Sequence, residues 1–279
     1  SLWQVWVSGE KTRPSKKLAN GLFLSKNCKK IIAWTKKIKA DFEKEFPETK
    51  NKIEVVYPAI PLPRIKKVKH MGINLLFVGR SFYEKGGLDA LAVFDLLTKK
   101  YKNGKATVVS KTPNDIKEKY SKNKKIRFLD LVEKDILMDI YSQTDIFIYP
   151  GYTDTLGFGI LECMSFGIPS ISVSGFLGED SKKEVIDDGK TGFLVKLPKG
   201  FKLGPLKFSY TQSVLLSEAE TKENPKIIKK IIKKASKMIN NLYIMKKMSE
   251  NCIETVKNGK FSIKERNKKL AEIYMESLK

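Results

Sequence analysis

The sequence is poor in the residues that build disulfide frameworks and metal sites. It holds three cysteines and one histidine among 279 residues. Cys28, Cys163 and Cys252 are far apart and form no C-x-x-C pair, so the pattern predicts reduced, structural thiols and neither a disulfide scaffold nor a zinc site. With His70 alone there is no histidine cluster for a metal and little scope for histidine acid–base catalysis.

Long apolar runs are scarce as well. No stretch approaches the roughly 20 uninterrupted apolar residues that a membrane-spanning helix needs, and the first ten residues lack the basic and then apolar regions of a signal peptide. A cytoplasmic location is therefore the expectation. Since 41% of the residues are hydrophobic, the chain can bury a substantial core, as one large domain or two small ones.

Acidic residues are outnumbered. The sequence has 31 Asp and Glu residues and 54 Lys and Arg residues, which gives a formal net charge of +23. Such a charge attracts nucleic acid, anionic lipid or phosphorylated small molecules, and it does not choose among them. The lysines are spread over nearly every segment, which favours a solvated surface over a dedicated polyanion site. Because no nucleic-acid motif is recognisable, we do not expect a nucleic-acid partner.

From residue 73 onward, short apolar stretches alternate with amphipathic ones. Strands are predicted at 73–78, 106–109, 126–129, 145–149 and 169–173, and helices at 88–99, 113–120, 135–142 and 159–166. This alternation predicts an α/β domain with a doubly wound, Rossmann-like parallel sheet. Ligands of such sheets bind beyond the carboxyl ends of the strands, so the loops that follow the strands are the candidate sites.

The N-terminal part is shorter and less regular. Residues 28–46 carry a helical apolar stripe that Pro47 ends, and a strand is predicted at 53–57. The proline-rich and then basic segment 58–70 is typical of an interdomain linker. We therefore predict two parts, residues 1–66 and residues 67–279.

The first candidate loop reads VGRSFYEKGG and follows the strand that begins the α/β region. Gly79 is followed by Arg80 and Lys85, which bracket a turn ahead of a helix. A guanidinium binds phosphate oxygens bidentately, a lysine adds a point charge, and a helix N-terminus adds backbone N–H groups, so the loop suits a phosphate. Taken alone, a basic residue in a loop is usually solvated surface.

The second candidate loop reads YPGYTDTLGFGILECMSFGIPSISV. Asp154 and Glu162 flank seven residues that include Gly157 and Gly159, and Glu162 would lie about one turn into the following helix. Carboxylates accept hydrogen bonds from sugar hydroxyls, and the glycines let backbone N–H groups approach a ligand. Singly, Glu162 would be an exposed helix residue and Asp154 a turn former. Combined with the first loop, the charges match a diphosphate between two polyols, which describes a nucleotide sugar.

The ordered motifs VGRSFYEKG, DTLGFGILE, LECMSFGIP and KEVIDDGKTGFLV resemble the C-terminal part of glycosyltransferase family 4, which are retaining enzymes of the GT-B fold. The resemblance runs from about Lys29 to the C-terminus. It implies a retaining hexosyltransferase that uses a nucleoside-diphosphate sugar as donor. It further implies an α/β fold that is the C-terminal half of GT-B, preceded by a short, incomplete N-terminal segment.

By that resemblance, Arg80 and Lys85 would hold the donor diphosphate, Glu162 the ribose hydroxyls and Asp154 the transferred sugar, and these four form the expected catalytic core. Segment 130–132 falls where the family commonly contacts the base. The donor-binding set is completed by Gly79, Leu131, Val132, Thr155, Leu156, Gly157, Phe158 and Gly159. Tyr141 and Asp145 match a helix-to-strand junction that is expected to be structural.

The resemblance also implies how the reaction proceeds. Negative charge builds on the diphosphate as the sugar–phosphate bond breaks, and preorganised cations lower that barrier. Attack comes from the face that the nucleotide leaves, and the phosphate takes the proton of the acceptor. No metal or cofactor is expected, in agreement with the missing histidine and DxD-type clusters.

Three departures from the family pattern stand out. Asp154 replaces a glutamate and is one methylene shorter, which puts the identity of the sugar in doubt. Asp130 and the stretch SKTP at 110–113 replace glycines near the expected base pocket. The roughly 65 residues before the α/β part cannot supply a full acceptor domain, so the chain is either a fragment or a short form completed by another subunit.

Several alternatives stay open from the sequence alone. Helices predicted at 227–242 and 263–278 either finish the core or dock on the missing domain, in which case the chain exposes an apolar patch and forms oligomers. The acceptor is a sugar or a lipid-linked sugar, and the lysine-rich helix 227–242 suggests peripheral contact with anionic membrane. The competing function is a noncatalytic module that binds a nucleotide sugar or a partner protein. A nucleic-acid-binding protein is a third reading that rests on charge alone.

Overall fold

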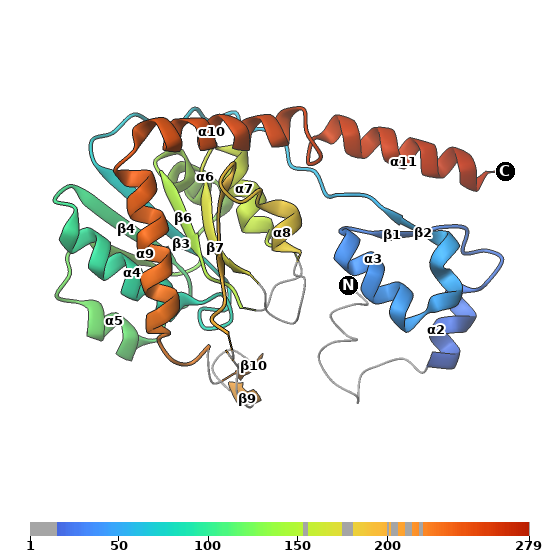
Figure 1. Ribbon diagram of the computed structural model, residues 1–279, viewed down its shortest axis with the longest axis horizontal. Coiled ribbons are helices and arrows are strands. Elements are labelled where there is room, and N and C mark those ends of the chain that lie inside the picture. Colours follow the sequence, from blue (N-terminus) through green and yellow to red (C-terminus); the bar gives the residue numbers. More distant parts are fainter. Residues whose placement is uncertain are drawn as a thin grey trace. The chain divides into compact units, whose positions relative to one another are not determined.

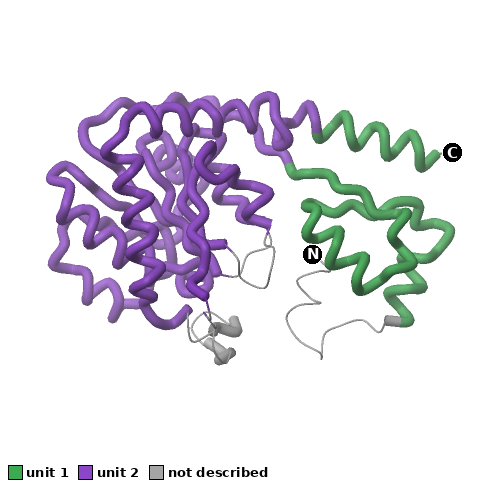
Figure 2. The backbone as a smooth tube through the Cα atoms, viewed as in Figure 1, with its two compact units in different colours: residues 1–58, 266–279 green, residues 59–265 purple. Residues whose placement is uncertain are grey.

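The computed structural model describes residues 16–152, 156–174, 181–199, 201, 206–209, 214–217 and 220–278. The chain divides into two compact units (Figures 1 and 2). Unit 1 comprises residues 1–58 and 266–279, and unit 2 comprises residues 59–265. The division therefore falls eight residues before the predicted boundary at 66/67, and the last helix belongs to unit 1.

Unit 2 is built on a six-stranded parallel sheet with the strand order β5-β4-β3-β6-β7-β8. The strands are β3 (Ile73–Val78), β4 (Gly104–Val109), β5 (Ile126–Leu129), β6 (Ile146–Tyr149), β7 (Ser170–Ser174) and β8 (Gly192–Lys196). The strand order reverses between β3 and β6, which lie side by side (Figure 1). This pair is the topological switch point, where ligands of doubly wound sheets bind.

The central strands form because their apolar runs are buried on both faces. In β3, Leu75, Leu76 and Phe77 are at most 1% exposed, and all four residues of β6 are buried. Continuous apolar runs of this kind are what a parallel sheet covered by helices requires. The predicted α/β fold class is confirmed, and the sequence missed β8.

The helices of unit 2 follow the strands in alternation. They are α4 (Gly87–Lys100), α5 (Asn114–Tyr120), α6 (Lys134–Ser142), α7 (Phe158–Ser165), α8 (Lys182–Val185), α9 (Pro225–Ile239) and α10 (Leu242–Lys257). Right-handed crossovers on either side of the switch point place α4 and α7 on opposite faces of the sheet. Helix α4 packs against α9, and α7 packs against α10. The hairpin of β9 (Leu206–Ser209) and β10 (Val214–Ser217) precedes α9.

Helix α9 is strongly amphipathic: Ile227, Ile231 and Ala235 are fully buried, while its lysines lie mostly on the opposite, exposed face. It ends at Ile239 rather than at the predicted residue 242. Asn241 then caps a separate helix, because its side chain accepts a hydrogen bond of 3.1 Å from the N–H of Ile244. The sequence missed α10, in which only three residues are fully buried.

Unit 1 contains α2 (Lys16–Phe23), β1 (Ile31–Ala33), α3 (Lys36–Glu45), the 3₁₀ helix η2 (Pro47–Lys52) and β2 (Ile53–Val55), together with most of α11 (Ile263–Ser277). Strands β1 and β2 pair in parallel. The predicted helix over 28–46 is wrong for its first part. Residues 31–33 are β-branched or small and pair with β2, and Thr35 begins α3 by accepting a 3.0 Å hydrogen bond from the N–H of Ile38.

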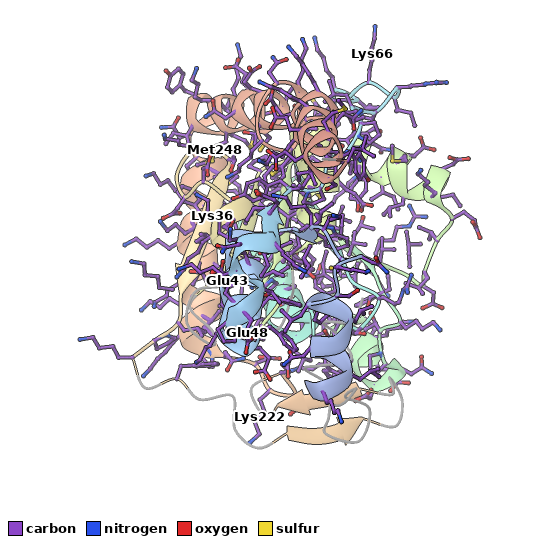
Figure 3. All side chains as sticks on the ribbon, turned by 90° about the vertical axis from the view of Figure 1, so that its right-hand side faces the viewer. Lys36, Glu43, Glu48, Lys66, Lys222 and Met248 are labelled. Carbon is purple, nitrogen blue, oxygen red and sulfur yellow. The ribbon has the colours of Figure 1, made fainter. Side chains whose placement is uncertain are left out.

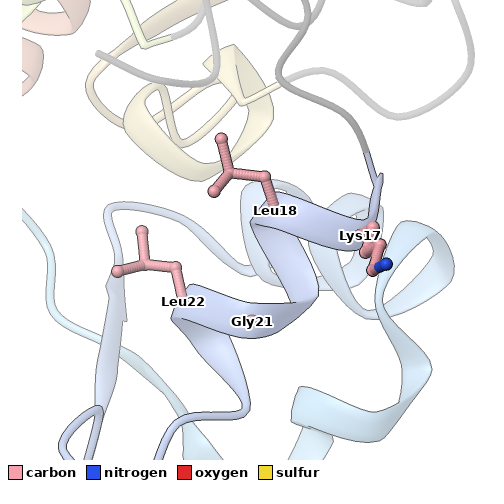
Figure 4. Close-up of a pocket in the computed structure, with 4 residues that line it drawn as sticks. All are labelled: Lys17, Leu18, Gly21 and Leu22. Carbon is pink, nitrogen blue, oxygen red and sulfur yellow. The ribbon is translucent and has the colours of Figure 1, made fainter.

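Helices α2 and α11 both expose apolar side chains. A hollow on α2 is lined by Lys17, Leu18, Gly21 and Leu22, and the two leucines are 66% and 57% exposed (Figure 4). On α11, Tyr274 and Met275 are 61% and 64% exposed. Of the two helices for which the sequence left docking open, α9 buries its apolar stripe, whereas α11 exposes Tyr274 and Met275.

The predicted linker, residues 58–70, has no regular helix or strand. Lys66 is exposed and its side chain points away from the chain (Figure 3). His70, at the end of this segment, is largely enclosed: its side chain is 20% exposed, and Nε2 lies 3.4 Å from Oδ2 of Asp145. Among the described residues, no helix is long and apolar enough to cross a membrane.

Candidate functional site

The two loops singled out from the sequence leave the sheet at the switch point. Strands β3 and β6 are neighbours in parallel register, with Leu75 opposite Ile146 and Leu76 opposite Phe147. Their carboxyl ends therefore lie at one edge of the sheet. The loops after Val78 and Tyr149 both start there, as the sequence predicted.

The two loops are in direct contact. The N–H of Gly151 donates a 2.9 Å hydrogen bond to the carbonyl of Lys85. Gly86 has a φ of +77°, and a Cβ atom there would lie 2.5 Å from Cβ of Pro150. Only glycine combines that backbone conformation with so close an approach. The second half of the first loop is thus packed onto residues 150–151.

The cations of the first loop lie ahead of α4. Arg80 is exposed, and Lys85 is partly buried with its Nζ 3.1 Å from Oε1 of Glu84. Helix α4 starts at Gly87, so its N-terminal N–H groups and the positive end of its dipole are close in sequence to both cations. A guanidinium, an ammonium and a helix N-terminus together form an environment that favours a phosphate group.

The second loop leads into α7 through a tight glycine turn. Gly157 has a φ of +85° and caps the helix, which begins at Phe158, one residue before the predicted start. A Cβ on Gly157 would lie 2.8 Å from Cδ1 of Ile160. Leu156 is fully buried and anchors the turn, whereas Phe158 is 45% exposed. Asp154 and Thr155 lie outside the described residues.

Glu162 is partly buried in α7 and has a specific partner. The hydroxyl of Tyr141, in α6, donates a 2.8 Å hydrogen bond to its Oε2. Tyr141 is 1% exposed, and burial raises the pKa of its hydroxyl well above the usual range, an effect that the neighbouring Cys163 and Glu162 reinforce. The hydroxyl therefore stays a donor. Glu162 is not the freely exposed helix residue that the alternative interpretation required.

Tyr141 and Asp145, both expected to be structural, have different surroundings. Oδ2 of Asp145 accepts a 2.8 Å hydrogen bond from the N–H of Asn74, at the edge where β3 and β6 begin. This contact serves the sheet, as expected. Tyr141 instead touches a candidate site residue, which the sequence did not indicate because the two positions lie 21 residues apart.

The predicted base-contact residues lie in the loop between β5 and α6. Leu131 is 46% exposed and Val132 is partly buried. Because the strands are parallel, this loop leaves the same edge of the sheet as the loop after β3. Strand β4 lies between β5 and β3, so the two loops are two strands apart. Topology thus brings Arg80, Lys85, Glu162 and this loop to one edge.

Sequence reasoning missed two buried ionisable residues beside the site. Asp89 in α4 is 1% exposed and Lys182 in α8 is 2% exposed, and both contact residues 150–152. Asp89 falls in the first turn of a helix, where an acidic residue is commonplace. No pattern in the sequence distinguishes it from a solvated one.

Comparison with known families finds a match over the part of the chain that contains the candidate site. The family model described as "Glycosyl transferases group 1" matches residues 72–202, a range that contains Arg80, Lys85 and Glu162. Residues 72–202 are therefore similar to a group 1 glycosyl transferase domain. The range covers all six strands of the parallel sheet.

A relative in sequence is also named as a glycosyltransferase. An uncharacterized glycosyltransferase of Haemophilus influenzae is 28% identical over 174 residues, which is 60% of this chain and 47% of that protein. The chain thus spans about half the length of that relative.

Solved structures give the fold. A glycosyltransferase from Rickettsia africae matches with a TM-score of 0.69 at 20% identity, over 94% of this chain and 67% of that one. The pneumococcal O-GlcNAc transferase GtfA, in complex with UDP and GlcNAc, matches with a TM-score of 0.64 at 16% identity, over 90% of this chain and 45% of that one. The chain therefore shares the α/β fold of GT-B glycosyltransferase structures, and the predicted fold class is confirmed.

Proposed function

We propose that the chain is the donor half of a retaining glycosyltransferase, a hexosyltransferase that transfers a sugar from a nucleoside-diphosphate sugar to a sugar or lipid-linked acceptor. The observation that carries the proposal is the convergence of Arg80, Lys85 and Glu162 at the switch point of a group 1 domain. A nucleotide-bound relative of the same fold, whose structure holds UDP and GlcNAc, supports it.

Each residue of the site has a proposed role. Arg80 and Lys85 bind the diphosphate, together with the backbone of residues 156–159. Glu162 accepts hydrogen bonds from the ribose hydroxyls, and Tyr141 holds its carboxylate in place. Leu131 and Val132 contact the base. Asp154 binds the transferred sugar, a role that rests on the family resemblance alone.

The proposed chemistry is leaving-group stabilisation. The bond between the anomeric carbon and the diphosphate oxygen breaks, and a bond to the acceptor oxygen forms on the same face. The proton of the acceptor passes to the departing phosphate, so the products are the glycosylated acceptor and a nucleoside diphosphate. Arg80 and Lys85 would stabilise the charge that builds on the diphosphate, and we propose that no resident cofactor takes part.

Calorimetric titration of UDP, GDP and ADP into the chain tests the site. We expect one nucleotide to bind, and both Arg80→Ala and Glu162→Ala to weaken it by roughly 10- to 100-fold, because each removes a charge-assisted hydrogen bond. Arg127→Ala, which removes an exposed arginine on β5, is the matched control and should bind normally. A folded wild-type chain that binds none of the three would contradict the assignment.

The competing function is a noncatalytic binding module. It predicts the same result in the nucleotide titration, so a different measurement must separate the two functions. The chain spans 47% of its Haemophilus relative, so transfer is best measured after the chain is combined with an acceptor-binding half. Release of nucleoside diphosphate that depends on both acceptor and Arg80 would support the enzyme. Nucleotide-sugar binding without any turnover in the completed protein would favour the noncatalytic module.

We further propose peripheral contact with anionic membrane from the cytoplasmic side, through α9. This helix has no acidic residue, and its exposed lysines are Lys226, Lys229, Lys230, Lys233 and Lys237. Co-sedimentation with anionic vesicles at low salt should fall when Lys229 and Lys233 are both changed to Glu. The same reversal at exposed Lys183 and Lys190 should have less effect. Equal binding by both double variants would show that only net charge matters.

A further inference from the structure

A buried polar network lies beside the two candidate loops. It centres on Asp89, in the first turn of α4. Oδ1 of Asp89 accepts a 2.7 Å hydrogen bond from the N–H of Asn224, and Oδ2 accepts one from the hydroxyl of Tyr152 and one of 3.2 Å from Nδ2 of Asn224. Nδ2 of Asn224 also donates to the Tyr152 hydroxyl at 3.0 Å. The carboxylate thus joins α4, the start of α9 and the chain after β6.

A second buried charge holds the same segment. The ammonium of Lys182 donates to the carbonyl of Gly151 and, at 3.4 Å, to that of Pro150. The carbonyl of Pro150 also accepts a 3.1 Å hydrogen bond from the N–H of Val173 in β7. A lysine that is 2% exposed is costly to bury unless its donors are satisfied. The hydrogen bonds from Lys182 to these carbonyls therefore fix the backbone at the point where β6 ends.

The segment that both groups hold, residues 150–152, is the one that touches the cation loop. Gly151 donates to the carbonyl of Lys85 at 2.9 Å, and Gly86 packs directly on Pro150. A displacement of residues 150–152 would therefore shift the backbone of Lys85. Asp89 and Lys182 thus act on Lys85 indirectly, through the hydrogen bond between Gly151 and the carbonyl of Lys85.

We propose that Asp89 and Lys182 are positioning residues for the donor diphosphate: they hold residues 150–152 from two sides and thereby set the position of Lys85. This inference rests on the proposed function. Binding sites need their groups held to within a fraction of an ångström, and buried, fully hydrogen-bonded networks supply that rigidity. Neither side chain touches the ligand in this scheme.

The mildest test is Tyr152→Phe, which removes the hydroxyl bonded to Asp89 while keeping the ring that stacks on Phe201. We expect the affinity for the nucleotide that the wild type binds to fall roughly three- to tenfold, the size of one lost hydrogen bond. The matched control is Tyr120→Phe, which removes another buried tyrosine hydroxyl, bonded at 3.0 Å to Glu223. It does not contact residues 150–152 through that hydroxyl and should bind nucleotide normally.

Lys182→Met supplies a second variant that keeps an unbranched side chain, one atom shorter, and removes its charge. It should weaken nucleotide binding at least as much as Tyr152→Phe does. A double-mutant cycle separates positioning from general loss of stability. If the network acts through Lys85, then Tyr152→Phe and Lys182→Met should each change nucleotide affinity by less than about twofold in a Lys85→Ala background.

The outcomes distinguish the two proposals. If the wild type binds no nucleoside diphosphate although folded, the donor site itself is overturned, and the positioning role with it. If Arg80→Ala weakens binding but Tyr152→Phe and Lys182→Met behave like Tyr120→Phe, only the positioning role is overturned. Undiminished effects in the Lys85→Ala background would also overturn it. Should Lys182→Met fail to fold, Tyr152→Phe and its cycle decide the question.

Discussion

The two units differ in how much each buries. Unit 2 has a parallel sheet whose central strands are enclosed on both faces, with all four residues of β6 buried. In unit 1 a small cluster of Ala19 and Phe46 is completed by the partly buried Phe23 and Phe42, with ring centroids 4.9 to 5.3 Å apart. A short chain segment buries a smaller share of its surface, so its stability depends on few side chains.

That difference also explains where the chain can bury charged side chains. Burying ions such as Asp89 and Lys182 costs free energy, and a large apolar core can offset that cost where a small one cannot. Unit 2 holds both of these residues as well as Arg80, Lys85 and Glu162. Unit 1 instead uses ion pairs near its surface, such as Lys30 with Glu276 at 3.0 Å.

The largest effect is expected from Phe46→Ala. Removing this ring, which is 3% exposed, should destabilise unit 1 by about 3 to 5 kcal/mol. Hydrogen exchange followed residue by residue should show lost protection within 16–58 while protection of the sheet of unit 2 persists. Equal loss in both units would mean that they unfold as one, and the comparison drawn here would fail.

Next in size is the pH dependence that Asp89 gives to unit 2. Burial is the main cause that raises the pKa of Asp89 from 3.8 to about 6, against the opposing hydrogen bonds from Tyr152 and Asn224. Because the folded state holds the proton more tightly, the stabilisation is complete below pH 3.8 and is lost as the pH rises through 6. The gap between the two pKa values is worth about 3 kcal/mol.

Urea unfolding of wild type and Asp89→Asn between pH 4 and 7 measures this effect. The free energy of unfolding of the wild type should decline with pH relative to that of the variant by up to about 3 kcal/mol. The other titratable groups that act on Asp89 are the hydroxyl of Tyr152 and the carboxylate of Glu223. Parallel pH curves for the two proteins would show that Asp89 does not titrate in this range.

A smaller effect is expected from Tyr141→Phe, which removes the hydrogen bond to Glu162. If Glu162 binds the ribose, affinity for the nucleotide should fall roughly three- to tenfold, and the 2′-deoxy form of that nucleotide should lose less. Tyr101→Phe removes a tyrosine hydroxyl bonded at 2.9 Å to Asn240 and serves as the control. Equal losses for both forms of the nucleotide would argue against the ribose role.

The smallest effect is expected at the exposed leucines of unit 1. Changing Leu18 and Leu22 to Ser should alter the free energy of unfolding by less than about 0.5 kcal/mol each, because both side chains are more than half exposed. Sedimentation velocity of the same variant tests whether this surface mediates self-association. A large loss of stability would show that these side chains pack against more of the chain than α2.

The sequence by itself determined the α/β class, most elements of the parallel sheet and the edge at which Arg80, Lys85 and Glu162 lie. These follow from local facts: apolar runs make buried strands, and parallel strands place their following loops at one edge. It failed at Ile31–Ala33 and in α10, where the pairing partner or packing surface lies far along the chain. Only the tertiary structure decided that Tyr141 meets Glu162, and that Asp89 and Lys182 are buried against residues 150–152. Those contacts join positions 21 to 63 residues apart, and whether a polar side chain is solvated or enclosed depends on what the rest of the chain brings to it.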